Sequence, residues 1–289
     1  ADVLRGEGEL VEAHKMAKRG ISTFPESVGA KECSNLIYQI EAKSSLVKTE
    51  RVWNAPFPEI LLRYRNLTKA YFRVVSYDWV TYMRESNRHS EYIPSNERKQ
   101  WLAKKPVKEW SVDLPPTKDF KERVEKVTPP KDLKPGSYFL FASYDPEFKE
   151  QENEVSYSSF WVSDLSLIVR SLRGSGNLEG FVLNANTGEP IQGAKVRSWK
   201  RENNRKIDLE PVSTDANGLF RIKHARASIR VLVSHDGHTL SSKDLFYVYQ
   251  NNNQYRPSER SVFFTDRSLY RPGQTIRYKG VSYHIDQEK

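Results

Sequence analysis

The residue types best suited to binding a metal ion in this sequence are two histidines on either side of one short turn. His235 and His238 flank Asp236, and imidazole nitrogens and carboxylate oxygens are common zinc ligands. A zinc site needs at least three protein ligands, and no further histidine or cysteine lies nearby in the sequence. The sequence therefore predicts a polar turn between two strands here, without a metal ion or any other cofactor.

The single cysteine, Cys33, is the thiol that could act as a nucleophile. It shares one face of a predicted helix with Leu36 and Ile40, and a thiol buried among apolar side chains is usually unreactive. One cysteine also excludes an internal disulfide. A serine nucleophile would need a Gly-x-Ser-x-Gly elbow, which the sequence lacks. We therefore expect a protein that is not an enzyme.

Two further segments resemble ligand-binding loops only in part. Asp215, Asn217 and Gly218 are spaced like the start of a calcium loop, but the glutamate that would complete the loop is missing. Asn-Gly is a strong hairpin signal, so a hairpin turn is expected at Asn217 and Gly218. The Gly-Ser-Gly segment at 174–176 lacks the Lys-Ser/Thr pair and the helix of a phosphate-binding loop, and we interpret 173–177 as a linker.

The charge of the chain points to a mixed-sign surface. Lysine and arginine number 46 against 37 acidic residues, a net charge of +9, but cations and acids are interleaved along most of the chain. Such interleaving indicates a solvated surface and no nucleic-acid interface. A weak attraction to anionic surfaces stays open. No apolar run of about 18 residues occurs, so we expect no membrane insertion.

The six tryptophans have two interpretations. Buried in cores, they would fill thin β-sandwiches; exposed together, they would form a platform on which sugars stack. The first is favoured, above all for Trp161 on a predicted strand. The tryptophans are Trp53, Trp79, Trp101, Trp110, Trp161 and Trp199. The triplet that begins at Asn66 fits a glycosylation acceptor, and we expect it to be bare.

Residues 1–44 have the pattern of a helical hairpin. Apolar or small residues recur every three or four positions over 10–21 and over 30–40, and Pro25 breaks the pattern between them. One such hairpin cannot bury its apolar stripe alone, so it must lean on a neighbouring unit.

The rest of the chain has the period of β structure. Residues 45–174 are predicted to form one antiparallel sandwich, with strands at 60–64 and 71–75, a short helix near 97–104, and closing strands at 159–163 and 165–169. Pro135 and Gly136 predict a type II turn from which a strand leaves. Residues 178–248, with short strands and dense turns, predict a second sandwich. Residues 249–289 predict the opening strands of a further domain that continues beyond this chain.

The string at 264–274 resembles the signature with which domains of the alpha-2-macroglobulin family open. We interpret it as a structural turn, and the residues that carry the resemblance are Asp266, Arg267, Tyr270, Arg271, Pro272, Gly273 and Gln274. The unit before it is similar to carboxypeptidase regulatory-like, transthyretin-like sandwiches, on Gly180, the 187–191 segment, Gly193, Asn217, Gly218 and Phe220. The resemblance covers about 45–289. The fold class implied is mainly β, with tandem macroglobulin-like and transthyretin-like sandwiches after a short helical hairpin.

This resemblance implies the N-terminal part of a large extracytoplasmic protein, periplasmic or bound to the cell envelope, of the bacterial type that traps proteases. Its partners would be other domains of the same chain and the trapped proteases. Many members carry a thioester that requires Cys-x-x-Gln, but Leu36 stands where Cys33 would need glutamine, so we expect no thioester here. Two alternatives stay open: a cell-surface carbohydrate-binding or adhesion module, and a noncatalytic domain of a peptidase.

Overall fold

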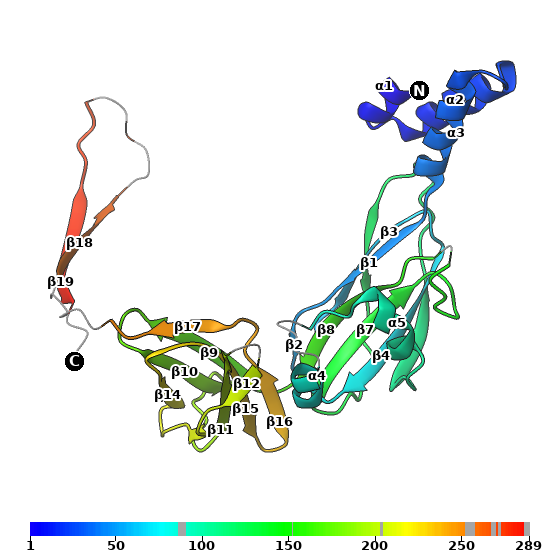
Figure 1. Ribbon diagram of the computed structural model, residues 1–289. Coiled ribbons are helices and arrows are strands. Elements are labelled where there is room, and N and C mark those ends of the chain that lie inside the picture. The colour runs from blue at the N-terminus through cyan, green and yellow to red at the C-terminus, as the bar shows by residue number, and fades with distance from the viewer. Residues whose placement is uncertain are drawn as a thin grey trace.

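The computed structural model describes residues 1–85, 91–151, 153–202, 205–251, 258–266, 270 and 273–285. The protein is mainly β, as predicted: a helical hairpin is followed by two β-sandwiches and then by a separate β-hairpin (Figure 1). Within these described ranges, no helix has the length and apolar character needed to span a membrane.

The N-terminal helices form the predicted hairpin. They are α1 (Asp2–Gly6), α2 (Leu10–Thr23) and α3 (Val28–Glu41). Ala13 and Ala17 of α2 are fully buried against Leu36 and Ile40 of α3, and such small side chains let the two helix axes approach closely. Ser27 caps α3, because its hydroxyl accepts a hydrogen bond of 3.1 Å from the Ala30 amide.

Asn66 ties this helical hairpin to the first sandwich. Its side-chain amide donates to the carbonyls of Ile40 (2.7 Å) and Ala42 (3.0 Å), which are left without helical partners where α3 ends. Asn66 also has a positive φ of 56°, a conformation that asparagine tolerates better than most residues. The nitrogen that a glycan would occupy is thus engaged in holding two units together.

The first sandwich packs a three-stranded sheet on a five-stranded sheet. The small sheet has the order β1 (Ser44–Lys48), β3 (Ile60–Arg65), β6 (Arg123–Val127), and the large sheet has the order β2 (Val52–Trp53), β8 (Ser156–Val162), β7 (Gly136–Ser143), β4 (Lys69–Tyr77), β5 (Lys108–Asp113). The pairs are antiparallel except for the short β2–β8 contact. Leu62, Phe72 and Phe160 fill the space between the sheets, which is the core predicted from the alternating pattern.

The second face of the large sheet is buried as well. Seven of the eight residues of β7 are buried, because α4 (Trp79–Glu85) and α5 (Ser95–Leu102) cover the face opposite the small sheet. Phe139 stacks on Tyr77 at 4.4 Å and meets Trp101 edge-on at 4.9 Å under these helices. A strand buried on both faces explains why β7 reads as a continuous apolar run and not as an alternating one.

The second sandwich packs a three-stranded sheet on a six-stranded one. The first has the order β14 (Leu219–Lys223), β10 (Asn177–Asn184), β9 (Leu165–Leu172). The second contains β11 (Lys195–Glu202), β12 (Arg205–Asp208), β13 (Val212–Ser213), β15 (Arg226–His235), β16 (His238–Ser241) and β17 (Phe246–Tyr249). Val182, Val196 and Ile229 are fully buried between the two sheets.

The pairing of strand β9 differs from the prediction. Residues 165–169 were expected to close the first sandwich, but β9 pairs along its whole length with β10. Most of the predicted linker 173–177 is therefore the loop of a hairpin, residues 173–176, and Asn177 already belongs to β10; Gly174 and Gly176 turn the loop with φ of 76° and 71°. Glycine and serine suit a linker and a hairpin loop equally, so composition could not separate the two.

Two predicted turns also differ in detail. Asn217 and Gly218 do lie in a turn, but β13 before it pairs with β11 and β14 after it pairs with β10. The turn therefore crosses from one sheet to the other, and the prediction of a hairpin was wrong. Strand β7 does leave at Gly136, but the φ of 154° there is far from the value of about +80° that a type II turn requires.

One carboxylate on the outer face of the β10 sheet lies between two arginines. Glu179 accepts from Arg221 of β14 at 2.7 Å and from Arg170 of β9 at 2.9 Å, so its charge joins three neighbouring strands. The hydrogen bond from Arg221 is the main cause that lowers the pKa of Glu179 from its usual 4.5, and Arg170 adds to it.

The contacts of Glu179 with Arg170 and Arg221 predict a contribution to the stability of the fold that is lost in acid. Since the pKa of Glu179 is lowered in the folded state, its stabilisation is complete above pH 4.5 and is lost as the pH falls through the lowered value. Glu179→Gln should cost about 1 kcal/mol of unfolding free energy at neutral pH, because both arginines are largely exposed. Urea unfolding of the two proteins should converge on acidification; a gap that is constant with pH would contradict this assignment.

Gly180 leaves less room for a side chain than the other described glycines of the second sandwich. A Cβ at this position would lie 2.4 Å from Cζ of Phe220 and 2.7 Å from the Ile168 carbonyl oxygen. Gly180→Ala should therefore destabilise the second sandwich by about 1–3 kcal/mol. The matched control is Gly29→Ala in α3, where the nearest atom lies 3.8 Å away and alanine favours the helix. Calorimetry that showed equal effects of the two substitutions would refute the close-packing argument.

Candidate functional site: the junction between the two sandwiches

The histidines singled out by their spacing form polar contacts in the second sandwich. His235 and His238 face each other where β15 and β16 turn, and His235 lies 3.2 Å from the Asp236 carboxylate. Nδ1 of His238 accepts a hydrogen bond of 3.1 Å from the Asp164 amide. Across the described residues, no three His, Cys, Asp or Glu side chains are grouped so that they could hold a metal ion.

The other chemical candidates have structural surroundings. Cys33 is half-buried on α3 and faces α2, where a Cβ on Gly20 would lie 3.2 Å from its sulfur. One side-chain oxygen of Asp215 accepts from the amides of Asn217 and Leu219, both at 2.9 Å, so the partial calcium motif closes its own turn.

The described residues of the signature string lie in or next to the C-terminal hairpin of β18 (Ser258–Thr265) and β19 (Tyr278–Ile285). The Tyr270 hydroxyl donates to the Asp266 carboxylate, and this bond is the main cause that lowers the pKa of Asp266. The same carboxylate accepts from the Arg277 amide at 3.2 Å. Gly273, with a φ of 84°, and Gln274 are exposed. Arg267, Arg271 and Pro272 lie outside the described residues, so the structural role of the whole string stays a prediction.

The tryptophans do not form an exposed platform. Five of the six are buried, and the sixth, Trp110, is half-buried and stacks on Phe72 at 5.1 Å. The buried five are Trp53, Trp79, Trp101, Trp161 and Trp199. The sugar-stacking interpretation of these residues was therefore wrong, and the core interpretation is confirmed.

Trp79 of α4 carries the apolar part of a contact between the two sandwiches. Its ring lies 5.7 Å from that of Trp161 in β8 and 5.5 Å from that of Trp199 in β11. Trp161 belongs to the first sandwich and Trp199 to the second, and all three rings are buried. The three indoles thus join the two units into one apolar cluster.

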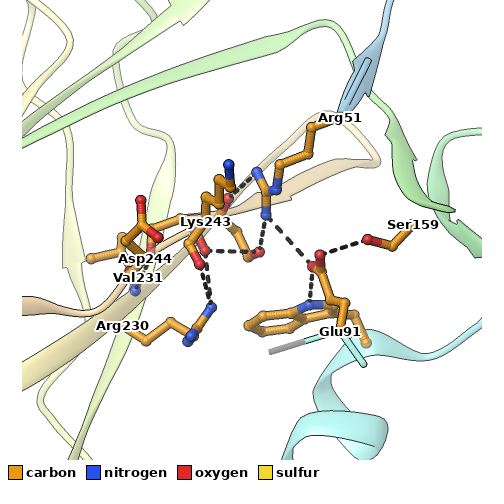
Figure 2. A network of polar contacts seen from close by, with 10 residues as sticks. Arg51, Glu91, Ser159, Arg230, Val231, Lys243 and Asp244 are labelled. Carbon is orange, nitrogen blue, oxygen red and sulfur yellow. Dashed lines mark hydrogen bonds and ion pairs between the residues drawn. The ribbon is translucent and has the colours of Figure 1, made fainter. Parts of the chain in front are cut away.

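Glu91 supplies the charge at this junction. Its carboxylate accepts from Nε1 of Trp79 at 2.8 Å and from the Ser159 hydroxyl at 2.9 Å, as Figure 2 shows. Nη2 of Arg51 lies 3.6 Å from the same carboxylate, whose side chain is only 14% exposed. A carboxylate so far from water must be paired, and these three partners meet that requirement.

Arg51 extends the network into the second sandwich. Its guanidinium donates to the Ser241 carbonyl at 2.9 Å and to the Ser241 hydroxyl at 2.8 Å. From the other side, Arg230 donates to the carbonyls of Ser242 (3.2 Å) and Lys243 (3.0 Å). Two arginines, one from each sandwich, therefore donate to the consecutive residues 241–243, at the end of β16 and the start of the connection to β17 (Figure 2).

Arg230 is unusual because it is charged and only 4% exposed. Burial lowers the pKa of its guanidinium, and the nearby Glu91 charge opposes that shift. Arginine nevertheless keeps its proton in proteins. The buried cation is thus offset by the carbonyls of the connection and by the field of Glu91, so the first sandwich helps to stabilise a charge of the second.

A second group of polar contacts lies where the chain passes between the sandwiches. The Ala185 amide donates to the Asp164 carbonyl at 2.8 Å, and the Asn54 amide group donates to the Asn186 side chain at 2.8 Å. Together with the His238 contact to Asp164, these bonds fix the short passage from β8 to β9. The junction holds two units in one orientation, and its groups are engaged in structural bonds and not arranged as a nucleophile with a base.

Sequence reasoning missed Arg51, Glu91 and Arg230. Each is a single charged residue in a polar or alternating stretch, and nothing in its spacing separates it from the solvated charges around it. Trp79 and Trp199 were identified as core residues, but not as partners, because they lie far apart in the chain and in different sandwiches.

Comparison with known proteins supports the fold. The sequence matches no family model and no curated protein. The structure is similar to a crystal structure of native alpha-2-macroglobulin from Escherichia coli that spans domains NIE-MG1, with a TM-score of 0.53 and 14% identity over 70% of this chain and 97% of that one. A longer fragment of the same protein, spanning MG0-NIE-MG1, gives a TM-score of 0.51 and 15% identity over 69% of this chain and 64% of that one.

A cryo-EM reconstruction of native E. coli alpha-2-macroglobulin is matched over 83% of this chain but only 15% of that one, at 17% identity and a TM-score of 0.42, and we draw no argument from it. At these identities the likeness establishes the fold. Most of this chain has the fold of the E. coli NIE-MG1 segment.

The junction predicts coupled unfolding of the two sandwiches. Trp199→Ala should cost about 3–5 kcal/mol and separate one calorimetric transition into two, because it removes a buried ring shared by both units. Small-angle scattering should show a wider spread of orientations. The matched control is Trp110→Ala, which loses a ring inside the first sandwich alone. If both variants kept a single transition and the same radius of gyration, the junction would not be the coupling element.

Proposed function

We propose that this chain is a noncatalytic part of the scaffold of an alpha-2-macroglobulin-like protein. The observation that carries the proposal is the fold match over 97% of the E. coli NIE-MG1 fragment. The fixed junction fits such a role, because a scaffold must hold its domains at set angles. The signature-like string at 264–274 supports it independently from the sequence.

In this proposal the parent protein traps proteases outside the cytoplasm, in the periplasm or at the cell envelope. The chain spans 64% of the longer E. coli fragment, and the activity would belong to the whole parent protein. The partners of the chain are then other domains of the parent, with proteases as the trapped targets.

We also propose a division of the chain into domains. We place the boundary between the sandwiches at Asp164, because β8 belongs to the first unit and β9 to the second. The first sandwich is then the macroglobulin-like domain and the second the transthyretin-like one. The β18–β19 hairpin is assigned as the opening pair of a further macroglobulin-like domain; its exposed Phe263, Phe264 and Tyr278 are consistent with strands that need a second layer.

The proposal is tested on the full-length parent protein with an endopeptidase. We expect one preferred cut outside residues 1–289, a rise in sedimentation coefficient, and a protease that loses activity on a large protein substrate while it keeps activity on a small peptide. Progressive degradation without compaction, or full activity on the large substrate, would refute trapping.

The chain alone is the matched control. Because the proposal gives it no reactive group, residues 1–289 added at equal concentration should leave the protease active on both substrates. Inhibition by the isolated chain would show that its role goes beyond a scaffold.

A further inference from the structure

Three segments meet at the end of the second sandwich remote from the junction. Backbone hydrogen bonds join the Gly176 amide to the Tyr249 carbonyl (2.9 Å), the His224 amide to the Gly176 carbonyl (2.8 Å) and the Asn251 amide to the Gly174 carbonyl (2.8 Å). The loop after β9, the turn between β14 and β15, and the end of β17 therefore form one continuous surface.

Two tyrosines of β17 lie side by side on this surface. Val248 between them is fully buried, so Tyr247 and Tyr249 both point away from the core. Their rings are 5.9 Å apart and nearly parallel, with an interplanar angle of 26°. Tyr247 is 49% exposed, and β17 pairs with β15 at the edge of its sheet (Figure 1).

Each tyrosine hydroxyl holds one arginine. Nε of Arg226 donates to the Tyr247 hydroxyl at 2.9 Å, and Nε of Arg173 donates to that of Tyr249 at 3.4 Å. Both arginines are exposed. A guanidinium fixed through Nε keeps its two terminal nitrogens as a planar fork, which is the geometry that binds carboxylate, sulfate or phosphate with two hydrogen bonds.

The three segments that meet here carry an excess of positive charge. The segments 170–179, 221–226 and 246–251 carry five cations, namely Arg170, Arg173, Arg221, Lys223 and Arg226, against a single acid, Glu179. That acid is engaged by Arg170 and Arg221. An excess of one sign on neighbouring segments attracts ligands of the other sign.

We propose that Tyr247, Tyr249, Arg173 and Arg226 form a binding site for an anionic polysaccharide, a sugar chain that bears carboxylate, sulfate or phosphate groups. The apolar face of a sugar ring packs on a phenol ring, while its anionic group meets the guanidinium bonded to the same phenol. This site lies apart from the junction and does not depend on the proposed scaffold function.

The geometry favours a sugar chain over the two other classes of polyanion. A ring sugar carries its anion directly on the ring, which matches the short separation between each phenol and its arginine. A membrane surface would call for apolar side chains that project beyond the cations, but both hydroxyls here are engaged with arginine. Single-stranded nucleic acid uses a groove with aromatic residues along it, whereas this surface offers one pair of rings.

The test measures binding of the whole chain by isothermal titration calorimetry. The probes are polygalacturonate and dextran sulfate, with neutral dextran as the uncharged control, a single-stranded DNA oligonucleotide, and vesicles that contain an anionic phospholipid. We expect the two acidic polysaccharides to bind, neutral dextran not to bind, and added salt to weaken the binding without abolishing it, because ring packing persists.

Two double variants separate the parts of the site. Arg173→Gln with Arg226→Gln, and Tyr247→Leu with Tyr249→Leu, should each weaken polysaccharide binding about tenfold or more. The matched control, Arg63→Gln with Arg123→Gln, removes the same charge from exposed positions on the first sandwich and should change affinity less than about twofold. The arginine variants keep the aromatic surface, so the proposal stays testable if the leucine variants fail to fold.

Three results would overturn the proposal. The first is that neither acidic polysaccharide binds at low salt. The second is that the control variant weakens binding as much as the arginine variant, which would show a diffuse charge effect. The third is tighter binding of DNA or of the vesicles than of either polysaccharide, which would assign the surface to that class of ligand.

Discussion

The structure depends on a buried carboxylate whose network of partners runs from the first sandwich to the second. Glu91 lies in the first sandwich and is held there by Trp79 and Ser159, and through Arg51 it reaches the main chain of the second. Loss of any one of these contacts would leave a charge in a low-dielectric region without its full set of partners, which is costly. The relative orientation of the two units therefore depends on these hydrogen bonds and this ion pair as well as on apolar burial.

Apolar packing between the two sandwiches favours the same arrangement. The large sheet of the first sandwich is covered on one face by the small sheet and on the other by α4 and α5. Trp79, on α4, packs against Trp199 of the second sandwich as well as against Trp161 of the first. Independent units joined by a flexible linker would not hold Trp79 against Trp199. The predicted linker after β9 is instead a hairpin loop, because β9 pairs with β10 and so belongs to the second unit.

The sequence was sufficient for the elements whose pattern is set by one buried face. The two long helices and β3 follow this rule, whereas β4 and β8 were predicted from their runs of apolar and aromatic residues, and the tryptophans were predicted as core residues. It was insufficient for β5 and β6, which lie at sheet edges and alternate with lysine, glutamate and arginine, so their hydrophobic signal is weak. It could not assign β9, because pairing partners are a property of topology. The junction was invisible for the same reason: its charged residues become special only when distant segments meet.

The basic end of the second sandwich shows how misleading charge order along a chain can be. Arg170, Glu179 and Arg221 look like ordinary interleaved charges in the sequence, yet strand pairing places the acid between two cations and leaves a net positive charge. Arg173 and Arg226 are separated in the sequence by strands β10 to β14, yet in the fold both contact neighbouring tyrosines of β17. Local alternation of sign therefore predicts a neutral surface only where neighbours in sequence are also neighbours in space. In a β-sandwich the field at a surface depends on residues brought together from neighbouring strands, and here they bring two arginines to one pair of tyrosine rings.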